Sequence, residues 1–242
     1  MNVFISGASS GIGEYLAYAY AKRGYALGIS ARRIDRLESV ASKCRSFGAS
    51  VQVYKHNVTS QKESTDIASS FIKHFGGIDI VIANAGVGGE DRVDTGDPSF
   101  INNVLQTNIL GVTNTIVPFI PVLKQSKSAT IGIISSVASF LPVPLHGGYS
   151  GSKVAVRYLA NVLYDDLSRY NISVTAVCPG FIKSEMTDDK PFFMPFIMDT
   201  DIAAEKIIYA LEKGKRNYIF PWQWRFIVPL LRKFPSLVRK FR

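Results

Sequence analysis

Two side chains that could move a proton lie four residues apart, Tyr149 and Lys153. Four residues make about one helical turn, so a helix here would place the phenol and the ammonium on one face. A phenol ordinarily titrates near ~10, and a fixed cation beside it favours the phenolate and moves this pKa toward working pH. The pair becomes a specific signal because Ser136 lies 13 residues upstream and a glycine-rich turn begins at Gly7. The sequence therefore predicts an acid–base centre at Tyr149.

A glycine-rich segment, Gly7-x3-Gly11-x-Gly13, separates an expected first strand from an expected first helix. Glycines permit a tight turn and let the backbone approach a pyrophosphate, and the N-terminus of the helix offers free N–H groups. The spacing differs from the GxGxxG fingerprint of many dinucleotide sites. The segment therefore indicates a dinucleotide phosphate site, and a purely structural turn is the alternative.

The end of the second expected strand carries two arginines, Arg32 and Arg33. In NAD-binding units an acidic residue near this point binds the ribose 2′-hydroxyl. Guanidinium groups would instead attract a 2′-phosphate. Asp35 is the competing acid, but an acid there also suits the first turn of the next helix. We therefore expect NADP(H) as the preferred cofactor, with NAD(H) as the alternative. A further alternative is that the arginines only begin a solvated helix.

The elements that must position these residues alternate regularly. Short runs rich in Val and Ile, apolar on both faces, are typical of parallel strands. They lie at residues 3–6, 26–31, 50–54, 78–83, 130–135, 173–177 and 217–220. Helical patterns lie at residues 11–23, 34–47, 60–75, 99–124, 149–169 and 201–213. The alternation predicts a single α/β domain with a doubly wound, Rossmann-type parallel sheet of about seven strands. Pro118 and Pro121 are expected to kink or end the helix at 99–124.

Composition and charge argue against several classes of protein. Cys44 and Cys178 fall in different expected elements and are interpreted as reduced, inert thiols, and the histidines form no metal-ligand spacing, so no metal is expected. The formal net charge is +9, but residues 1–212 hold 19 basic and 19 acidic residues. The excess lies in residues 213–242, with nine basic residues and no acid. A local excess argues against a nucleic-acid-binding face. Without a secretion signal or a long apolar run, we expect a cytoplasmic protein.

The ordered set of motifs resembles the short-chain dehydrogenase/reductase family over nearly the whole chain. The resemblance rests on the glycine segment, on Asn84-Ala85-Gly86, on Asn108, on Ser136, on Tyr149-x3-Lys153, and on Pro179-Gly180 with Ser184 four residues further on. Any one of these motifs is weak evidence, whereas the set at this spacing is specific.

The resemblance implies roles for four catalytic residues. Tyr149 would be the general acid for carbonyl reduction and the base for alcohol oxidation, while Lys153 would lower its pKa and hold the nicotinamide ribose. Ser136 would hydrogen-bond the substrate oxygen and stabilise the charge that develops there. Asn108 would position a water that links Lys153 to solvent. Ser135 is the neighbouring candidate, but the 13-residue gap to Tyr149 favours Ser136.

The resemblance also implies the cofactor contacts. Asn84 and Gly86 would line the adenine-ribose side, and Asn57 stands where the family often has an acid. Ser184 replaces the usual Thr near the nicotinamide amide, where Ile182 would add a backbone contact. The expected cofactor residues are Gly7, Ser9, Ser10, Gly11, Ile12, Gly13, Arg32, Arg33, Asn57, Val58, Asn84, Ala85, Gly86, Tyr149, Lys153, Pro179, Gly180, Ile182 and Ser184.

Two segments bear on the substrate and on partners. Residues 1–220 are expected to form the catalytic domain, with a substrate lid at about 181–200. Apolar lid residues suit an apolar substrate, or else they pack the lid on the body. Residues 221–242 read as a basic amphipathic tail, divided into two short helices by Pro229 and Pro235. We expect this tail to contact a membrane peripherally or to pack on a partner subunit.

The function that follows is NADP(H)-dependent interconversion of a carbonyl and a secondary alcohol in a small molecule. The family also implies a homodimer or homotetramer formed through the helices at 99–124 and 149–169. A non-catalytic dinucleotide-binding sensor and a membrane-peripheral scaffold are the alternatives. The presence of Asn108, Ser136 and the Tyr149–Lys153 pair favours the enzyme, because a sensor has no need of all four.

Overall fold

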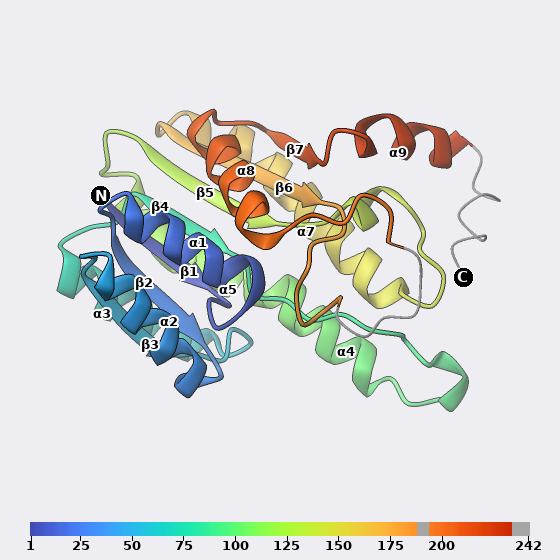
Figure 1. The fold of residues 1–242 in the computed structure, drawn as a ribbon, viewed down its shortest axis with the longest axis horizontal. Coiled ribbons are helices and arrows are strands. Elements are labelled where there is room, and N and C mark those ends of the chain that lie inside the picture. Colours follow the sequence, from blue (N-terminus) through green and yellow to red (C-terminus); the bar gives the residue numbers. More distant parts are fainter. Residues whose placement is uncertain (188–193, 234–242) are drawn as a thin grey trace.

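A computed structural model, which describes residues 1–187 and 194–233, has seven parallel strands with helices on both faces of the sheet (Figure 1). The strand order is β3-β2-β1-β4-β5-β6-β7, and each neighbouring pair is parallel. The strands are β1 (Asn2–Ser6), β2 (Ala26–Ala31), β3 (Val51–Lys55), β4 (Ile80–Ala83), β5 (Ala129–Ile134), β6 (Ile172–Pro179) and β7 (Asn217–Phe220). The predicted Rossmann-type sheet is confirmed.

Two layers of helices cover the sheet. One layer consists of α1 (Gly11–Lys22), α2 (Ile34–Ser46) and α8 (Thr200–Glu212). The other includes α3 (Gln61–Phe75), α5 (Gly111–Ile116) and α7 (Gly147–Ser168). Neighbouring strand residues enter opposite layers, as Phe4 and Ile5 do, and both are almost fully buried. This two-sided burial explains why the strands read as continuous apolar runs.

The segment expected as one helix at 99–124 is divided into several turns. α4 (Ser99–Leu105) continues into a π turn (Gln106–Leu110), and α5 is followed by a 3-10 turn (Val117–Phe119) and α6 (Ile120–Leu123). The expected interruption at Pro118 is present, because this residue lies in the 3-10 turn. The π turn was not expected, since the apolar periodicity carries no sign of it. The predicted single helix is corrected accordingly.

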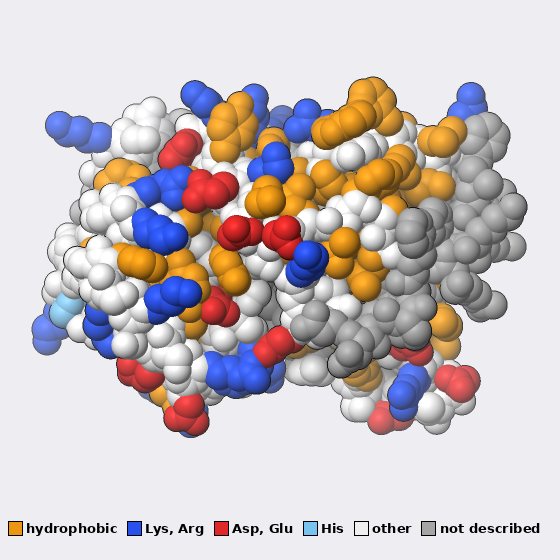
Figure 2. All heavy atoms as spheres, viewed as in Figure 1, with side chains coloured by type: hydrophobic (Ala, Val, Ile, Leu, Met, Phe, Trp, Pro, Cys, Tyr) orange, Lys and Arg blue, Asp and Glu red, His pale blue; other side chains and the backbone are white. Residues whose placement is uncertain are grey.

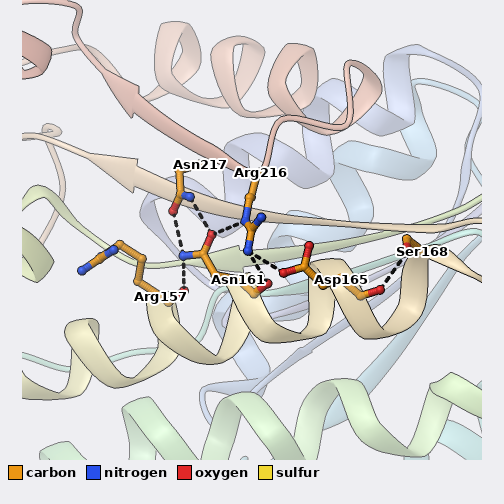
Figure 3. Close-up of polar contacts among 6 residues, drawn as sticks. All are labelled: Arg157, Asn161, Asp165, Ser168, Arg216 and Asn217. Atoms are coloured by element: carbon orange, nitrogen blue, oxygen red, sulfur yellow. Dashed lines mark hydrogen bonds and ion pairs between the residues drawn. The ribbon is translucent and has the colours of Figure 1, made fainter.

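Helix α7 is tied at its C-terminal half to the start of β7 (Figure 3). Arg216 donates to the side-chain and backbone oxygens of Asn161 at 3.0 and 3.1 Å, and pairs with Asp165 at 2.6 Å. Asn161 and Asn217 exchange two amide hydrogen bonds of 3.2 and 2.6 Å. These contacts fix the orientation of a helix whose first turn carries Tyr149.

The described part of the tail forms one helix, α9 (Trp224–Lys233), with Pro229 inside it. The expectation that Pro229 divides the tail is therefore wrong. The buried face of α9 packs against the 3-10 turn Val137–Phe140, and this packing stabilises a helix that local propensity alone would break. Pro235 lies outside the described residues. Within those residues, no helix combines the length and apolarity needed to cross a bilayer.

Candidate active site

The predicted site residues gather where the central strands end. The glycine turn follows β1, Asn84 follows β4, Ser136 follows β5, and Pro179 ends β6 before Gly180. Because these four strands are parallel neighbours, the segments that follow them meet at one edge of the sheet. The connections run in opposite directions from the β1–β4 boundary, which is the place where open α/β sheets bind ligands.

The glycine turn has a shape that side chains would block. Gly7 and Gly11 have left-handed φ values of 69° and 57°. Such values favour glycine. A Cβ on Gly7 would lie 2.6 Å from the Cα of Ala85, and one on Gly13 would lie 2.3 Å from the Gly7 oxygen. The turn is therefore packed closely against Ala85 and the start of α1, and we call it the glycine cradle. It also contains Ser9, Ser10 and Ile12.

Asn84 holds this cradle in place. Its side-chain nitrogen donates to the carbonyl oxygens of Ser6 and Gly7 at 3.1 and 2.9 Å. The hydroxyl of Ser6 accepts the backbone N–H groups of Asn84 and Ala85 at 3.2 and 3.3 Å. The amide nitrogen of Asn84 is thus committed to the turn, so any contact of this side chain with a ligand falls to its oxygen.

Tyr149 and Lys153 share one face of α7, with the Lys153 nitrogen 5.6 Å from the centre of the Tyr149 ring. This nitrogen donates to the carbonyl of Ile134 at 2.9 Å, and burial lowers the pKa of Lys153 to about 8. Burial raises the pKa of Tyr149, and a hydrogen bond with Ser136 opposes that rise. Lys153 was expected to lower the pKa of Tyr149. Desolvation of the buried phenol is the largest influence on this pKa, and it raises the pKa instead.

The two adjacent serines make different contacts. The Ser135 hydroxyl donates to the Lys153 carbonyl at 2.9 Å and so fastens α7 to the end of β5. The Ser136 hydroxyl accepts the N–H of Ala138 at 3.1 Å and hydrogen-bonds with Tyr149. Ser136 is therefore the serine that faces the phenol, in agreement with the spacing.

Asn108 is fully buried in the π turn. Its oxygen accepts the N–H of Val87 at 2.8 Å, and its nitrogen donates to the Val87 carbonyl at 2.9 Å and to the Ser152 hydroxyl at 3.0 Å. The Ser152 hydroxyl donates in turn to the carbonyl of Tyr149 at 2.7 Å. The side chain of Asn108 thus joins the segment after β4 to the first turn of α7.

Asp91 is a site residue that the sequence reasoning missed. It is buried, and its Oδ2 accepts the N–H of Gly148 at 3.0 Å at the N-terminus of α7. Its own N–H donates to the carbonyl of Leu145 at 2.8 Å. A carboxylate at the start of a helix is favourable. Asp91 therefore positions the turn that carries Tyr149, and its place in a segment without regular periodicity gave no signal.

Arg33 belongs to a cluster of anion-binding groups. Its guanidinium donates to the hydroxyls of Ser10 and Ser9 at 2.7 and 3.3 Å, and it pairs with Glu185 at 2.8 Å. Arg36 also pairs with Glu185. Two guanidinium groups thus pair with one carboxylate, while the two hydroxyls accept from Arg33, and such guanidinium groups are suited to an anion. Glu185 and Arg36 were missed, and Glu185 lies 152 residues from Arg33 along the chain.

A hollow of about 350 Å³ lies at the ends of β2 and β3. It is lined by Arg32, Lys55, His56, Asn57, Glu63, Asp66 and Ile67. Arg32 is exposed there, with no hydrogen bond or ion pair to the residues that the structure describes. The Asn57 oxygen accepts the N–H and the hydroxyl of Thr59 at 3.2 and 3.0 Å, so the atom expected to contact adenine is engaged in a turn. Val58 packs closely on Gly111.

The segment after β6 is organised by Thr187, another residue that was missed. The Thr187 hydroxyl donates to the carbonyl of Ile182 at 2.8 Å and accepts the N–H of Ser184 at 2.9 Å. A Cβ on Gly180 would lie 2.4 Å from the indole nitrogen of Trp224, so α9 packs directly on this segment. Residues 188–193 of the expected lid lie outside the described residues.

Cys44 and Cys178 are buried free thiols, and burial raises their pKa values to about 12 and about 11. Both thiols are therefore protonated at neutral pH. In the described ranges, no three His, Cys, Asp or Glu side chains come together as metal ligands.

A parallel sheet with a glycine cradle at its switch point defines the chain as a Rossmann-type protein. A sequence profile of the short chain dehydrogenase family matches residues 1–192. The chain therefore belongs to the short-chain dehydrogenase/reductase family, whose members are oxidoreductases acting on CH–OH groups.

Two curated relatives and one solved structure illustrate the similarity. An uncharacterized oxidoreductase of Myxococcus xanthus (strain DK1622) is 32% identical over 232 residues, covering 96% of this chain and 92% of that protein. The 11-beta-hydroxysteroid dehydrogenase-like 2 of Arabidopsis thaliana is 34% identical over 238 residues, covering 93% and 76%. The alcohol dehydrogenase from the archaeon Thermococcus sibiricus, complexed with 5-hydroxy-NADP, is 28% identical with a TM-score of 0.81, covering 90% and 95%.

Proposed function

We propose that the chain interconverts a carbonyl and a secondary alcohol with NADP(H), and that Tyr149 moves the proton. One observation carries this proposal: the Ser136–Tyr149 hydrogen bond and the buried Lys153 lie at the sheet edge that also bears the glycine cradle. The left-handed Gly7 and Gly11 and the close packing at Gly13 support a dinucleotide phosphate site, because they give a tight turn before the N-terminus of α1. The nicotinamide of a bound cofactor supplies or accepts the hydride.

The side chains divide the remaining chemistry among them. The raised pKa of Tyr149 keeps its phenol protonated at neutral pH, ready to donate to a carbonyl oxygen. Ser136 donates a hydrogen bond to the same oxygen and stabilises its developing negative charge. Lys153 favours the phenolate once the proton has left. Both amide hydrogens of Asn108 are occupied, so this residue acts by holding α7, and a water relay would need its backbone carbonyl.

The preference for NADP(H) is supported by the groups around Arg33. The Arg33 guanidinium lies between the hydroxyls of Ser9 and Ser10 and the carboxylate of Glu185, and a 2′-phosphate would take the place of this carboxylate. Arg32 lines the neighbouring hollow and adds positive charge on that side. In the family relative from Thermococcus sibiricus, an NADP derivative is bound.

Replacing Arg33 by Ala should raise the KM for NADPH by about tenfold to a hundredfold, because a charge-assisted contact is lost. The KM for NADH should change little, since NADH has no 2′-phosphate. Steady-state kinetics with both cofactors measure the effect. Arg45→Ala on the outer face of α2 is the matched control. An equal rise for both cofactors would show instead that Arg33 only supports the turn.

The proposed reaction is tested by following nicotinamide absorbance with a panel of aldehydes and ketones and the corresponding alcohols. We expect oxidation of NADPH with some carbonyls and slower oxidation of NADH. Tight NADPH binding without turnover on any member of a broad panel would favour the dinucleotide-binding sensor. No binding of either nucleotide would refute the cofactor proposal.

A homodimer or homotetramer is supported by an apolar stripe on α7. Val154, Tyr158 and Val162 recur every four residues and are exposed. Leu110 and Val117, from the segment that was expected as the helix at 99–124, are also exposed. A helix face of this kind is typical of an isologous subunit contact.

A further inference from the structure

Helix α9 and the turn before it carry apolar side chains on two opposite sides. Trp224, Val228 and Leu231 are at most 6% exposed and pack on the body of the protein. Trp222, Phe226 and Leu230 recur every four residues and are 63%, 70% and 52% exposed. Figure 2 shows apolar side chains gathered over α9 with basic side chains beside them. We call Trp222, Phe226 and Leu230 the outer stripe. Exposure of so many large apolar groups side by side marks an interaction surface.

The charge of the chain segment that bears the outer stripe restricts what can cover it. From residue 213 to residue 242 the chain has nine Lys and Arg and no acid, whereas residues 1–212 are balanced. Arg225 and Arg232 belong to α9 itself. The covering surface must therefore accept large apolar side chains and also carry negative charge. A second copy of α9 fits poorly, because a two-fold contact would bring these cations together. The surface of an anionic bilayer meets both requirements.

The buried face of α9 lies beside the segment that borders the candidate site. The Trp224 ring is 6.0 Å from that of Phe181 and 6.5 Å from that of Phe196. Phe196 and Met186 are exposed. Gly88 lies close to both Met186 and Tyr149, since a Cβ on Gly88 would be 3.6 Å from the Met186 sulfur and 3.0 Å from the Tyr149 ring. Exposed apolar side chains thus lie both beside α9 and near the phenol.

We propose that α9 docks the protein on the surface of an anionic membrane, with the outer stripe in the acyl boundary and the basic side chains on the headgroups. The exposed Phe196 beside α9 and Met186 near the phenol then let an apolar carbonyl or alcohol enter the site from the bilayer. This second part rests on the proposed function. The docking itself does not, and it can be measured without turnover.

Docking is tested by co-sedimentation of the full chain with vesicles of phosphatidylcholine alone or mixed with phosphatidylglycerol. The wild type should bind the anionic vesicles, and high salt should weaken this binding. The triple variant Trp222→Ser, Phe226→Ser, Leu230→Ser should bind at least about tenfold more weakly. The matched control replaces three other exposed apolar side chains, Tyr15, Phe47 and Ile202, by Ser. They lie together in the part of the chain with balanced charge, so this variant should leave vesicle binding unchanged.

Several results would overturn the docking proposal. Equal binding of wild type and the outer-stripe variant would do so, as would equal binding to neutral and anionic vesicles. Absence of wild-type binding, with a smaller oligomer of the outer-stripe variant on size-exclusion chromatography, would assign the stripe to a second copy. Circular dichroism checks that the variant is folded.

Entry from the bilayer has its own readout. The outer-stripe variant should lose activity at least about tenfold on a long-chain carbonyl dissolved in anionic vesicles. Its activity on a short, water-dissolved carbonyl should match the wild type. Equal loss on both substrates would overturn membrane entry, because the defect would then lie in the site. Absence of wild-type activity on every carbonyl would refute the proposed function and leave the docking result standing.

Discussion

Replacement of Tyr149 by Phe is expected to lower turnover by about 10²- to 10⁴-fold, the contribution usual for a positioned general acid. The change removes one oxygen and keeps the ring that lies near Gly88 and under the Lys153 nitrogen. NADPH should therefore bind with nearly the wild-type Kd, measured by fluorescence titration. Single-turnover rates with an active member of the carbonyl panel give the effect on the proton-transfer step.

The dependence of the rates on pH sharpens this test. Since the pKa of Tyr149 lies above its ordinary value, the phenolate needed for alcohol oxidation becomes more populated throughout the alkaline range. Wild-type oxidation should rise with pH, and the residual activity of Tyr149→Phe should not. Tyr209→Phe, on the exposed side of α8, is the matched control and should keep both rate and profile. Retained turnover in Tyr149→Phe would refute the proposed mechanism.

Replacement of Lys153 by Met should abolish turnover and at the same time stabilise the fold. Burial lowers the pKa of this ammonium from 10.5 to about 8, which corresponds to about 3 kcal/mol against the charged folded state at neutral pH. Loss of the hydrogen bond to the Ile134 carbonyl destabilises the variant by about 1 kcal/mol. The free energy of unfolding at pH 7 should therefore rise by about 2 kcal/mol, measured by urea denaturation.

The sign of the effect can be checked through its dependence on pH. Between about pH 8 and pH 10.5 the unfolded chain keeps a proton on Lys153 that the folded chain has released. Wild-type stability should rise relative to the variant across this window, because the unfolded state binds more protons there. The difference in the free energy of unfolding between the variant and the wild type should thus be smaller at alkaline pH than at pH 7. Lys73→Met, exposed on α3, is the control and should show neither effect. A destabilised Lys153→Met would contradict the assigned cost of burial.

The sheet and most of the site segments were predictable because they depend on local patterns. Strands buried on both faces leave continuous apolar runs, and strands such as β2 and β7 begin and end at the predicted residues. The glycine cradle, Ser136 and the Tyr149–Lys153 pair follow from fixed spacings along the chain. Their common position at one sheet edge then follows from the parallel order of β1, β4, β5 and β6.

What the sequence did not predict depends on contacts between distant segments. Glu185 reaches Arg33 and Arg36 only when the segment after β6 folds back. The carboxylate of Asp91 contacts α7 at a backbone N–H group, which no side-chain pattern in the sequence marks. The pKa of Tyr149 was expected to follow its helical neighbour, yet burial decides it, and burial is a property of the whole fold. Pro229 was read as a helix breaker, although packing of α9 on the body overrides local propensity.

The π turn at Gln106–Leu110 makes the segment from α4 to α5 equivalent to a regular helix with one residue inserted. Each residue of an α-helix adds a rotation of about 100°. A single-residue deletion here would give a smoother helix, yet it would rotate one end of the segment against the other. Val104 and Ile116, both fully buried on the two sides of the turn, could not then keep their places together. The number of residues in this segment is therefore fixed by the packing at both of its ends. A deletion should be tolerated more readily in the exposed turn after Arg92 than in this segment.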